Sequence, residues 1–224
     1  MIPIFVGYDT NSPIVYHTCV NSIIRLSSQP ISIIPLSLNL LKGYDKNQID
    51  GSNQFTYSRF LVPSLMEYQG HAIYIDGDMI LQNDISQLWN LRNTKYAVQV
   101  VKHNYVTKST KKYLDNKNEN YPCKNWSSVV IWNCSHTKNN LITPNFVKNS
   151  SGAQLHRFTW LDHNIDIGEL PIEWNWLSDE FGENEKSKLI HYTLGSPCYT
   201  KFSQTSMSDK WHEEKKLMEY CKDD

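Results

Sequence analysis

A buried strand that ends in two aspartates is the feature that most constrains the fold of this chain. Residues 72–75 read Ala-Ile-Tyr-Ile and run directly into Asp76, Gly77 and Asp78. In open α/β sheets, ligands bind at the carboxyl ends of the strands. Residues two apart share a face of a strand, and Gly77 lets the backbone turn so that both carboxylates can converge.

Two neighbouring carboxylates repel each other unless a cation or a proton offsets them. Hard divalent cations such as Mn²⁺ and Mg²⁺ suit such oxygen ligands. Asp76 and Asp78 therefore predict a divalent-cation site. The alternative is a pair of turn aspartates that cap the following segment.

The segments before this strand predict the opening of a parallel α/β sheet. Residues 2–6 form a short apolar run that is typical of a buried strand. Ser12 and Pro13 then offer a helix cap followed by proline at the first helical position. Residues 31–36 form a second β-rich run, and strand, helix, strand is the order that builds parallel sheets.

The later segments continue the alternation of strands and helices. We expect strands at 96–101, 129–132 and 189–192, helical segments at 57–68 and 152–161, and a C-terminal helix at 209–221. The polar stretch 102–124 predicts an excursion from the sheet, or a surface helix with loops. The fold class is therefore α/β, with a mixed, mostly parallel central sheet flanked by helices.

Composition excludes several classes of function. Lys and Arg number 22 against 23 Asp and Glu, so broad neutralisation of nucleic-acid phosphates is not expected. No apolar run approaches the roughly 18 residues that a membrane span needs. The N-terminus predicts an opening strand rather than a signal peptide. The five scattered cysteines form no Cys-x-x-Cys pair, which favours free thiols in a reducing compartment and hence a cytoplasmic protein.

His191 marks a second candidate site. It lies in the strand predicted at 189–192 and is followed by a turn that contains Gly195, Ser196 and Pro197. Imidazole suits Mn²⁺ and similar ions, and the N–H groups of such a turn suit a phosphate. The alternative is a hydrogen-bonded structural histidine beside an ordinary turn.

Two further clusters have ligand-binding chemistry. Gly7, Tyr8 and Asp9 end the first predicted strand, where a ring and a carboxylate could hold a base and a ribose. The alternative is a strand-to-helix turn with a capping aspartate. Arg59 could pair with a phosphate or with the metal carboxylates, or it could be a surface arginine of a helix.

Residues 170–176 place two indoles around an asparagine. Trp174 and Trp176 flank Asn175, and flat apolar faces beside polar groups suit sugar rings. The alternative is a loop whose aromatic rings are buried over the sheet.

Taken in chain order, these segments resemble the nucleotide-sugar-dependent glycosyltransferases of the GT-A fold. The resemblance is strongest to family eight, the group of glycogenin and bacterial galactosyltransferases. The segments that carry it are 7–9 at the nucleotide end of the first strand, 57–63 with its Tyr, Arg and Pro, 72–91 with the metal motif, 126–133 as the donor-sugar strand, 170–175 on the acceptor side, and His191 with Gly195 as the closing motif.

This resemblance implies a single GT-A domain over residues 1–224. Residues 1–100 would form the nucleotide-binding half, 101–208 the donor-sugar and acceptor half, and 209–222 a C-terminal helix. The implied activity is that of a metal-dependent hexosyltransferase. It would move a sugar from a nucleotide diphosphate sugar, most simply a UDP-sugar, to a glycan, lipid or protein acceptor, with retention of configuration.

The resemblance also implies roles for individual residues. Asp76, Asp78 and His191 would hold Mn²⁺, or alternatively Mg²⁺. The donor would contact Gly7, Tyr8, Asp9, Tyr57, Arg59, Asp76, Gly77, Ser127, Ser128 and Gly195. A retaining enzyme would line the reacting face of the sugar with Gln154, His156 or Arg157, whereas an inverting one needs a carboxylate base, for which the local candidates are Asp162, Glu173, Asp179 and Glu180.

The sequence departs from the family pattern at two functional positions. Pro197 stands where the family has a lysine that contacts the diphosphate, and Lys201 is the nearest lysine after it. The family's Asp-Gln-Asp motif is missing, and residues 151–157 occupy its place. These departures keep open a catalytically degenerate module that binds nucleotide sugars. The Asp76-Gly77-Asp78 motif at a strand end separately keeps open a phosphatase with Asp76 as nucleophile.

Overall fold

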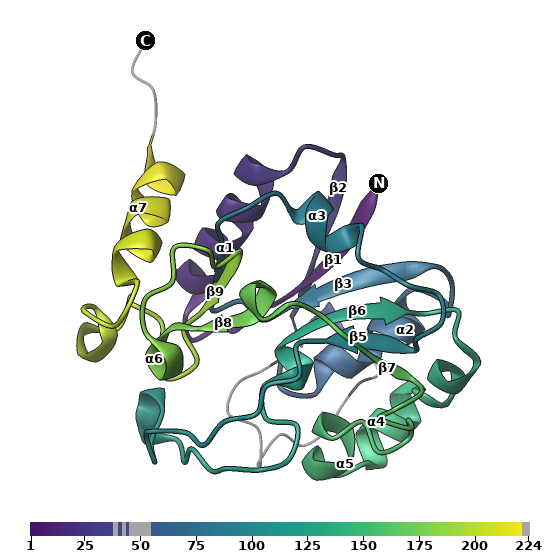
Figure 1. Cartoon of the computed structure of the whole chain (residues 1–224). Coiled ribbons are helices and arrows are strands. Elements are labelled where there is room, and N and C mark those ends of the chain that lie inside the picture. The colour runs from purple at the N-terminus through teal and green to yellow at the C-terminus, as the bar shows by residue number, and fades with distance from the viewer. Residues whose placement is uncertain (38–39, 42–43, 45–54, 221–224) are drawn as a thin grey trace.

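The computed structural model of the chain describes residues 1–37, 40–41, 44 and 55–220. Its centre is a six-stranded sheet in the order β2-β1-β3-β6-β5-β7 (Figure 1). The strands are β1 (Ile2–Gly7), β2 (Ile31–Leu36), β3 (His71–Ile75), β5 (Val98–Val100), β6 (Val129–Asn133) and β7 (Ile167–Glu169). β6 runs antiparallel to β3 and β5, while the other neighbouring pairs are parallel. The predicted mixed α/β sheet is confirmed.

A second, three-stranded sheet was not predicted. It consists of β4 (Met79–Leu81), β9 (Leu189–His191) and β8 (Trp176–Leu177), in the order β4-β9-β8. β4 pairs with β9 in antiparallel register, so Met79 lies opposite His191. This pairing brings a late segment of the chain against the turn that follows β3.

Helices cover both faces of the large sheet (Figure 1). Ile73 and Ile75 of β3 pack toward α1 (Pro13–Leu26) and α3 (Ile85–Trp89). The alternate side chain, Tyr74, packs toward α2 (Val62–Leu65), α4 (Pro144–Asn149) and α5 (Gly152–His156). Successive side chains of a strand point to opposite faces, which explains why this central strand is apolar and buried from Ala72 to Ile75.

The predicted C-terminal helix is present as α7 (Ser208–Glu219), and Cys221 of that prediction lies outside the described residues. Trp211 is buried against Ile190 of the second sheet. Glu214 accepts hydrogen bonds from α1, with 2.6 Å to the Arg25 guanidinium and 2.6 Å to the Asn21 amide. These contacts fix α7 beside α1.

Two predicted helical segments differ from the structure, and a third segment follows one of its two predicted alternatives. The segment 57–68 divides into a 3₁₀ turn, η2 (Ser58–Leu61), and the short α2. The helix expected at 152–161 ends at His156, because Phe158 adopts a left-handed backbone with φ of 51°. Within the described part of 102–124 there is no α-helix, only the 3₁₀ turn η3 (Tyr113–Asp115).

The remaining short elements are η4 (Trp126–Ser128), η5 (Thr137–Leu141), η6 (Ile172–Asn175), α6 (Ser178–Phe181) and η7 (Thr200–Phe202). Within the described ranges, no helix is long and apolar enough to cross a membrane. Cys19, Cys123, Cys134 and Cys198 are free thiols.

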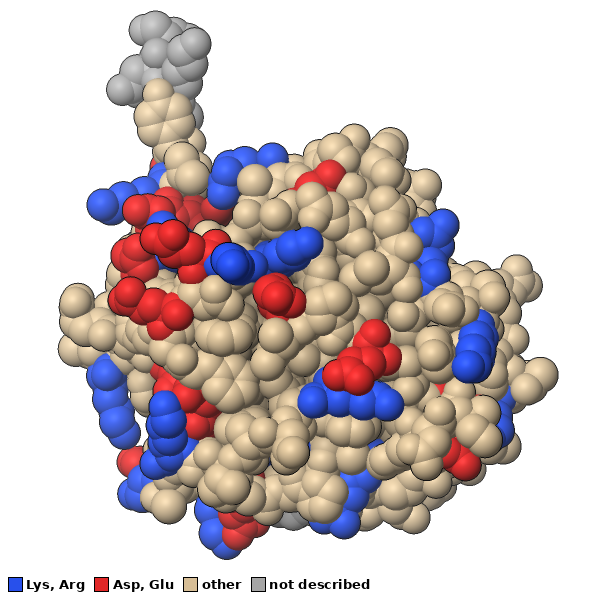
Figure 2. Space-filling model, in the orientation of Figure 1, with Lys and Arg blue, Asp and Glu red and all other residues tan. Residues whose placement is uncertain are grey.

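Charged side chains of both signs intermingle on the face of the molecule shown in Figure 2. Acidic groups gather there over the region of α7 in Figure 1, with lysines and arginines beside them. This distribution agrees with the formal net charge of −1.

Candidate functional site

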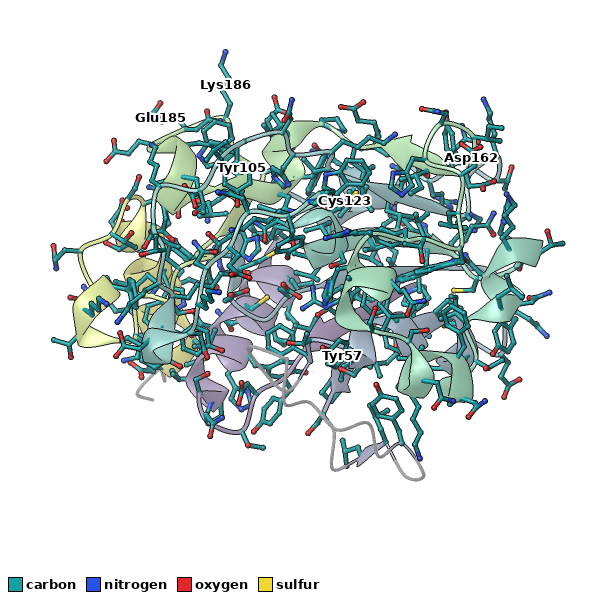
Figure 3. All side chains as sticks on the ribbon, turned by 90° about the horizontal axis from the view of Figure 1, so that it is seen from below. Tyr57, Tyr105, Cys123, Asp162, Glu185 and Lys186 are labelled. Carbon is teal, nitrogen blue, oxygen red and sulfur yellow. The ribbon has the colours of Figure 1, made fainter. Side chains whose placement is uncertain are left out.

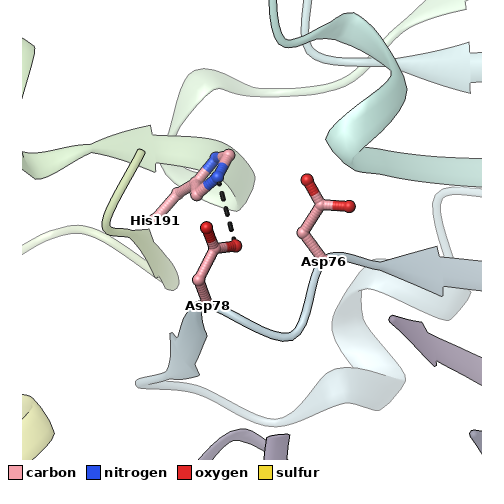
Figure 4. A group of neighbouring side chains, drawn as sticks. All are labelled: Asp76, Asp78 and His191. Carbon is pink, nitrogen blue, oxygen red and sulfur yellow. Dashed lines mark ion pairs between the residues drawn. The ribbon is translucent and has the colours of Figure 1, made fainter. Parts of the chain in front are cut away.

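Two carboxylates and an imidazole converge where the two sheets meet (Figure 4). β3 ends at Ile75 and delivers Asp76, and the chain turns at Gly77 before β4 begins. The pairing of β4 with β9 then places His191 against this turn. One ligand atom from each of Asp76, Asp78 and His191 lies within 4.8 Å of the other two. The structure thus brings together the predicted metal ligands, although His191 is over 100 residues from the two aspartates in the chain.

Glycine is required at the turn itself. A Cβ atom on Gly77 would lie 2.2 Å from the carbonyl oxygen of Gly7, and one on Gly7 would lie 2.6 Å from the ring of Phe55. Neither distance is possible for a real side chain. The ends of β1 and β3 can therefore approach each other because Gly77 has no side chain, and the missing side chain of Gly7 leaves room for Phe55.

Asn175 fixes the orientation of the His191 imidazole. The side-chain nitrogen of Asn175 donates to Ser128 Oγ at 2.8 Å and to the carbonyl of Asn125 at 3.2 Å. Its Oδ1 therefore faces His191, where it lies 2.9 Å from Nδ1 and accepts a hydrogen bond from it. The other ring nitrogen, Nε2, lies 3.4 Å from Asp78 Oδ1. This is the arrangement of a metal-ligating histidine with an oriented second nitrogen.

Asp76 is buried and held by two neighbours. The Arg59 guanidinium lies 2.9 Å from its Oδ1, and the Tyr74 hydroxyl donates to the same oxygen at 2.5 Å. Arg59 also donates to the carbonyl of Ser127 at 2.9 Å. Burial raises the pKa of Asp76 above its usual value, and the charge of Arg59 opposes that rise. Arg59 is buried rather than a surface arginine, so that alternative is wrong.

Asp78 has a different environment. Burial would raise the pKa of its carboxyl, but the adjacent His191 outweighs this effect and the pKa lies below its usual value. Within the described part of the chain, its Oδ1 is buried and has no hydrogen-bond partner. A buried carboxylate oxygen that makes no hydrogen bond, with an imidazole nitrogen 3.4 Å away and a second carboxylate nearby, fits a divalent cation.

A cavity of about 510 Å³ opens beside these three residues. Most of the predicted site residues lie on its wall. They are Tyr57, Arg59, Asp76, Asp78, Ser127, Ser128, His156, Arg157 and His191. A space of this volume is typical of small-molecule sites.

A second cavity adjoins the first at Asp78 but is much smaller, at about 20 Å³. The predicted donor contacts that line it are Gly7, Asp9, Gly77 and Gly195. The rings of Tyr113 and Tyr199, also on its wall, stack with their centroids 5.5 Å apart. The space that remains suits about one water molecule.

Three predicted residues lie outside both linings. Tyr8 packs edge-on against Tyr16, with ring centroids 5.1 Å apart. The side chain of Gln154 accepts a hydrogen bond from the backbone of Ser151 at 2.8 Å and completes a capping box at the start of α5. Asp162 is exposed, and Figure 3 shows it at the edge of the molecule, well away from Tyr57.

The other candidate carboxylates also lie outside the larger cavity's lining. Glu180 is buried and accepts hydrogen bonds from Thr107 and from the backbone of Lys108. Asp179 accepts from Thr205 and from the backbone of Leu194. These hydrogen bonds give both side chains a structural role.

His156 is neutral at physiological pH. Burial lowers the pKa of its imidazole to about 3. Its Nδ1 lies 2.8 Å from the hydroxyl of Ser127, on the wall of the larger cavity. A neutral imidazole there acts as a hydrogen-bonding group.

Residues 107–121, which we call the strap, form a wall of the larger cavity that sequence reasoning missed. Lys112, Tyr113 and Tyr121 of the strap face this space. Tyr113 N donates to the carbonyl of Leu194 at 2.6 Å, and the ammonium of Lys124 donates to Asn118 at 2.6 Å. The only sequence signal was a polar composition, which does not indicate where a segment packs.

The two indoles do not form a sugar platform at this cavity. Trp174 is 1% exposed within the core beside β9. The ring nitrogen of Trp176 donates to the carbonyl of Gly182 at 2.9 Å. The alternative of aromatic rings buried over the sheet is confirmed for Trp174, and Asn175 between them serves His191 instead.

Comparison with known proteins agrees with this architecture. The family model described as "Glycosyl transferase family 8" matches residues 20–195. "Protein CDI" of Arabidopsis thaliana is 39% identical over 230 residues, which cover 98% of this chain and 87% of the plant protein.

Solved structures show the same fold at low sequence identity. The galactosyltransferase LgtC, in complex with donor and acceptor sugar analogues, aligns with a TM-score of 0.62 at 10% identity, over 99% of this chain and 98% of LgtC. The bifunctional glycosyltransferase WbbM aligns with a TM-score of 0.64 at 17% identity, and GlyE of Streptococcus pneumoniae with 0.62 at 14%. Both alignments include 96% of this chain, but only 49% of WbbM and 60% of GlyE.

Proposed function

The chain belongs to glycosyl transferase family 8, and we propose that it transfers a sugar from a nucleotide diphosphate sugar, most simply a UDP-sugar, to a glycan, lipid or protein acceptor. One observation carries this proposal. Asp76, Asp78 and His191 form a cluster that fits a divalent cation, at the edge of a cavity of about 510 Å³. A hexose is the sugar class we propose for the donor, and the cytoplasm is the compartment we propose.

The cluster would hold Mn²⁺ in preference to Mg²⁺, because His191 adds a nitrogen to the two carboxylates. When bound, such an ion acts as a Lewis acid toward the diphosphate leaving group. The protein's own contribution is to fix the ligands in advance. Arg59 holds Asp76 through a 2.9 Å ion pair, and Asn175 holds His191 through a 2.9 Å hydrogen bond. Preorganised charge of this kind stabilises the transition state.

The donor would span the two cavities. We place the nucleoside beside Asp9, Gly7, Gly77 and Gly195, on the wall of the smaller cavity. This cavity, at about 20 Å³, admits a nucleoside only when the stacked rings of Tyr113 and Tyr199 move apart. Ser127, Ser128, Tyr57, His156 and Arg157 line the larger one, where we place the transferred sugar. The Nε of Arg157 is buried and makes no hydrogen bond to any described residue, so it can serve a sugar hydroxyl.

The placement of carboxylates favours retention of configuration. An inverting transferase needs a carboxylate base on the acceptor side. The predicted bases Asp162, Glu173, Asp179 and Glu180 all lie outside the larger cavity's lining. Apart from the metal-binding pair, the carboxylate on that wall among the described residues is Glu119, which forms an exposed ion pair with Lys117.

The phosphatase alternative has less support. A nucleophilic aspartate needs a free carboxylate oxygen. Both oxygens of Asp76 contact Arg59 Nη1, at 2.9 and 3.2 Å, and Tyr74 donates to one of them. These bonds hold Asp76 as a fixed ligand.

A panel of nucleotide sugars tests the proposal. We expect Mn²⁺ together with one nucleotide sugar to raise the melting temperature, because a ligand that binds only the folded state stabilises it. The best donor should then be hydrolysed slowly, or transferred when sugar acceptors are added, with Mn²⁺ required. Binding without turnover after long incubation would favour the degenerate binding module. If no nucleotide sugar binds with Mn²⁺ present, the proposal fails.

A further inference from the structure

The larger cavity contains few basic groups that are free to meet a diphosphate. Among the described residues on its wall, the basic side chains are Arg59, Lys112, Lys117 and Arg157. Arg59 is occupied by Asp76 and Ser127. Lys117 is exposed and paired with Glu119. Arg157 comes from the C-terminal end of α5, on the side where we place the sugar.

The strand end that follows His191 supplies no cation. Residues 192–200 contain neither lysine nor arginine. Lys201 is exposed, lies outside both cavity linings and has its ammonium 5.5 Å from the ring of Phe202. A charge that faces the diphosphate must therefore come from another segment.

Lys112 of the strap is held at the required place. It shares the cavity wall with Asp76, Asp78 and His191. The adjacent backbone is fixed, because Tyr113 N donates to the carbonyl of Leu194 at 2.6 Å, three residues beyond His191. Lys112 N itself donates to the carbonyl of Asn116 at 2.8 Å. Lys112 therefore lines the same space as the metal cluster and is not one of its three ligands.

Thr193 offers a second group beside Lys112. Its side chain is 5% exposed and lies on the wall of the larger cavity. Within the described ranges, its hydroxyl oxygen is buried and has no hydrogen-bond partner. A buried hydroxyl without a partner lowers stability, so it indicates a group that a ligand satisfies.

We propose that Lys112 and Thr193 form the diphosphate subsite, with the ammonium and the hydroxyl donating to phosphate oxygens of the donor. This inference rests on the proposed function. In the transfer step, the bond between the anomeric carbon and the phosphate oxygen breaks, and its electron pair stays on that oxygen. Lys112 keeps its proton and stabilises the charge of the nucleoside diphosphate that leaves.

Four variants test the subsite: Lys112→Met, Lys112→Arg, Thr193→Val and, as control, Lys111→Met. Lys111 precedes Lys112 on the strap but is exposed and paired with Asp115 at 3.3 Å. Calorimetry with Mn²⁺ would compare UDP, which has the diphosphate, with UMP, which has a single phosphate. Melting temperatures would be recorded for all variants.

We expect Lys112→Met to lower the affinity for UDP at least about tenfold, which corresponds to about 1.4 kcal/mol of binding free energy. The affinity for UMP should fall about threefold or less. Lys112→Arg should restore much of the UDP affinity, because the charge is kept. Thr193→Val should lower the affinity for UDP several-fold. The melting temperature of this variant should stay level or rise, because the lost hydroxyl makes no hydrogen bond to a described residue. Lys111→Met should match the parent.

The outcomes separate the two proposals. If the parent binds UDP and Lys112→Met and Thr193→Val bind it equally well, the subsite is refuted and the proposed function stands. If the parent binds none of UDP, ADP and GDP with Mn²⁺, the proposed function fails and the subsite fails with it. Equal losses for UDP and UMP would also refute the subsite, since they would place Lys112 away from the second phosphate.

Discussion

Replacing Asn175 by alanine tests whether an amide sets the metal affinity of this site. Asn175 is fully buried, and its Oδ1 accepts a hydrogen bond from His191 Nδ1 at 2.9 Å. Without that acceptor, the imidazole is free to rotate or to carry its proton on Nε2, the atom that would meet the ion. The variant should therefore bind Mn²⁺ more weakly, although no ligand has been removed.

The contacts of Asn175 set the expected loss of metal affinity and of stability in this variant. Loss of a partner that orients a metal-ligating histidine costs about 10- to 100-fold in metal affinity, or about 1.4–2.7 kcal/mol. The side chain also donates to Ser128 Oγ at 2.8 Å and to the Asn125 carbonyl at 3.2 Å. At about 1 kcal/mol for each hydrogen bond, the free energy of unfolding should fall by about 2–4 kcal/mol.

Asn139→Ala is the matched control for this stability loss. Asn139 is equally buried and donates to the carbonyls of Ala97 at 2.8 Å and Asn133 at 2.9 Å. Asn133 pairs with His71, at the end of β3 away from Asp76. Mn²⁺ titration and urea unfolding would be measured for both variants. Asn139→Ala should lose comparable stability but keep Mn²⁺ affinity within about twofold. Parent-like Mn²⁺ binding by Asn175→Ala, or equal losses in both variants, would refute the reasoning.

Three further predictions concern the same edge of the sheet and one helix cap. Asp78→Asn should abolish divalent-dependent turnover and leave the fold intact, although its carboxylate lies 3.4 Å from His191 Nε2; unchanged Mn²⁺-dependent hydrolysis of a nucleotide sugar would exclude Asp78. Gly77→Ala should lower the free energy of unfolding by about 1–3 kcal/mol in urea, because its Cβ would lie 2.2 Å from the Gly7 carbonyl oxygen. Asp84 caps α3 through Ser86 N at 2.9 Å, and hydrogen bonds from Ser28 and Ser86 outweigh desolvation and hold its pKa at about 2, below the ordinary 3.8. Its contribution is therefore complete above pH 4 and is lost as pH falls toward 2. Asp84→Ala should cost about 1 kcal/mol at pH 7, and the gap to the parent should close by pH 2; a gap that does not change with pH would contradict this assignment.

Local patterns made the centre of the fold predictable. The apolar run before Asp76 could only be buried on both faces, and the structure packs Ile73 and Tyr74 into opposite layers. Pro13 likewise marks the start of α1, although the Ser12 side chain makes no capping hydrogen bond. Such features depend on neighbours in the chain, so a single sequence contains them.

Helix lengths were less predictable because tertiary packing decides where a helix ends. The capping pattern of Ser151 and Gln154 is readable in the sequence and does start α5. The left-handed residue Phe158, whose ring packs in the core, then prevents continuation, and no glycine announces it. The same capping bond holds the Gln154 side chain at the helix start, outside the cavity.

The site itself is assembled by contacts that no local pattern contains. The sequence around His191 and around Asp78 marks each as a candidate ligand. They meet because β4 pairs with β9, and β4 has only three residues, which is too short for a periodic pattern to reveal it. The indoles that flank Asn175 predicted a sugar-binding segment, whereas in the structure Asn175 orients His191. Asn175 is the last residue of η6, directly before β8, and β8 pairs with the strand that contains His191.

The strap shows why composition alone places no residue in a site. Its lysines look alike in sequence, yet Lys111 is exposed, Lys117 is paired at the surface and Lys112 faces the metal cluster. Backbone contacts make this difference, among them the hydrogen bond from Tyr113 N to the carbonyl of Leu194. Because Leu194 follows His191 closely, the same strand end positions the proposed metal ligand and the strap that carries Lys112. A deletion that shortened the chain between His191 and Leu194 would therefore displace His191 and Lys112 together.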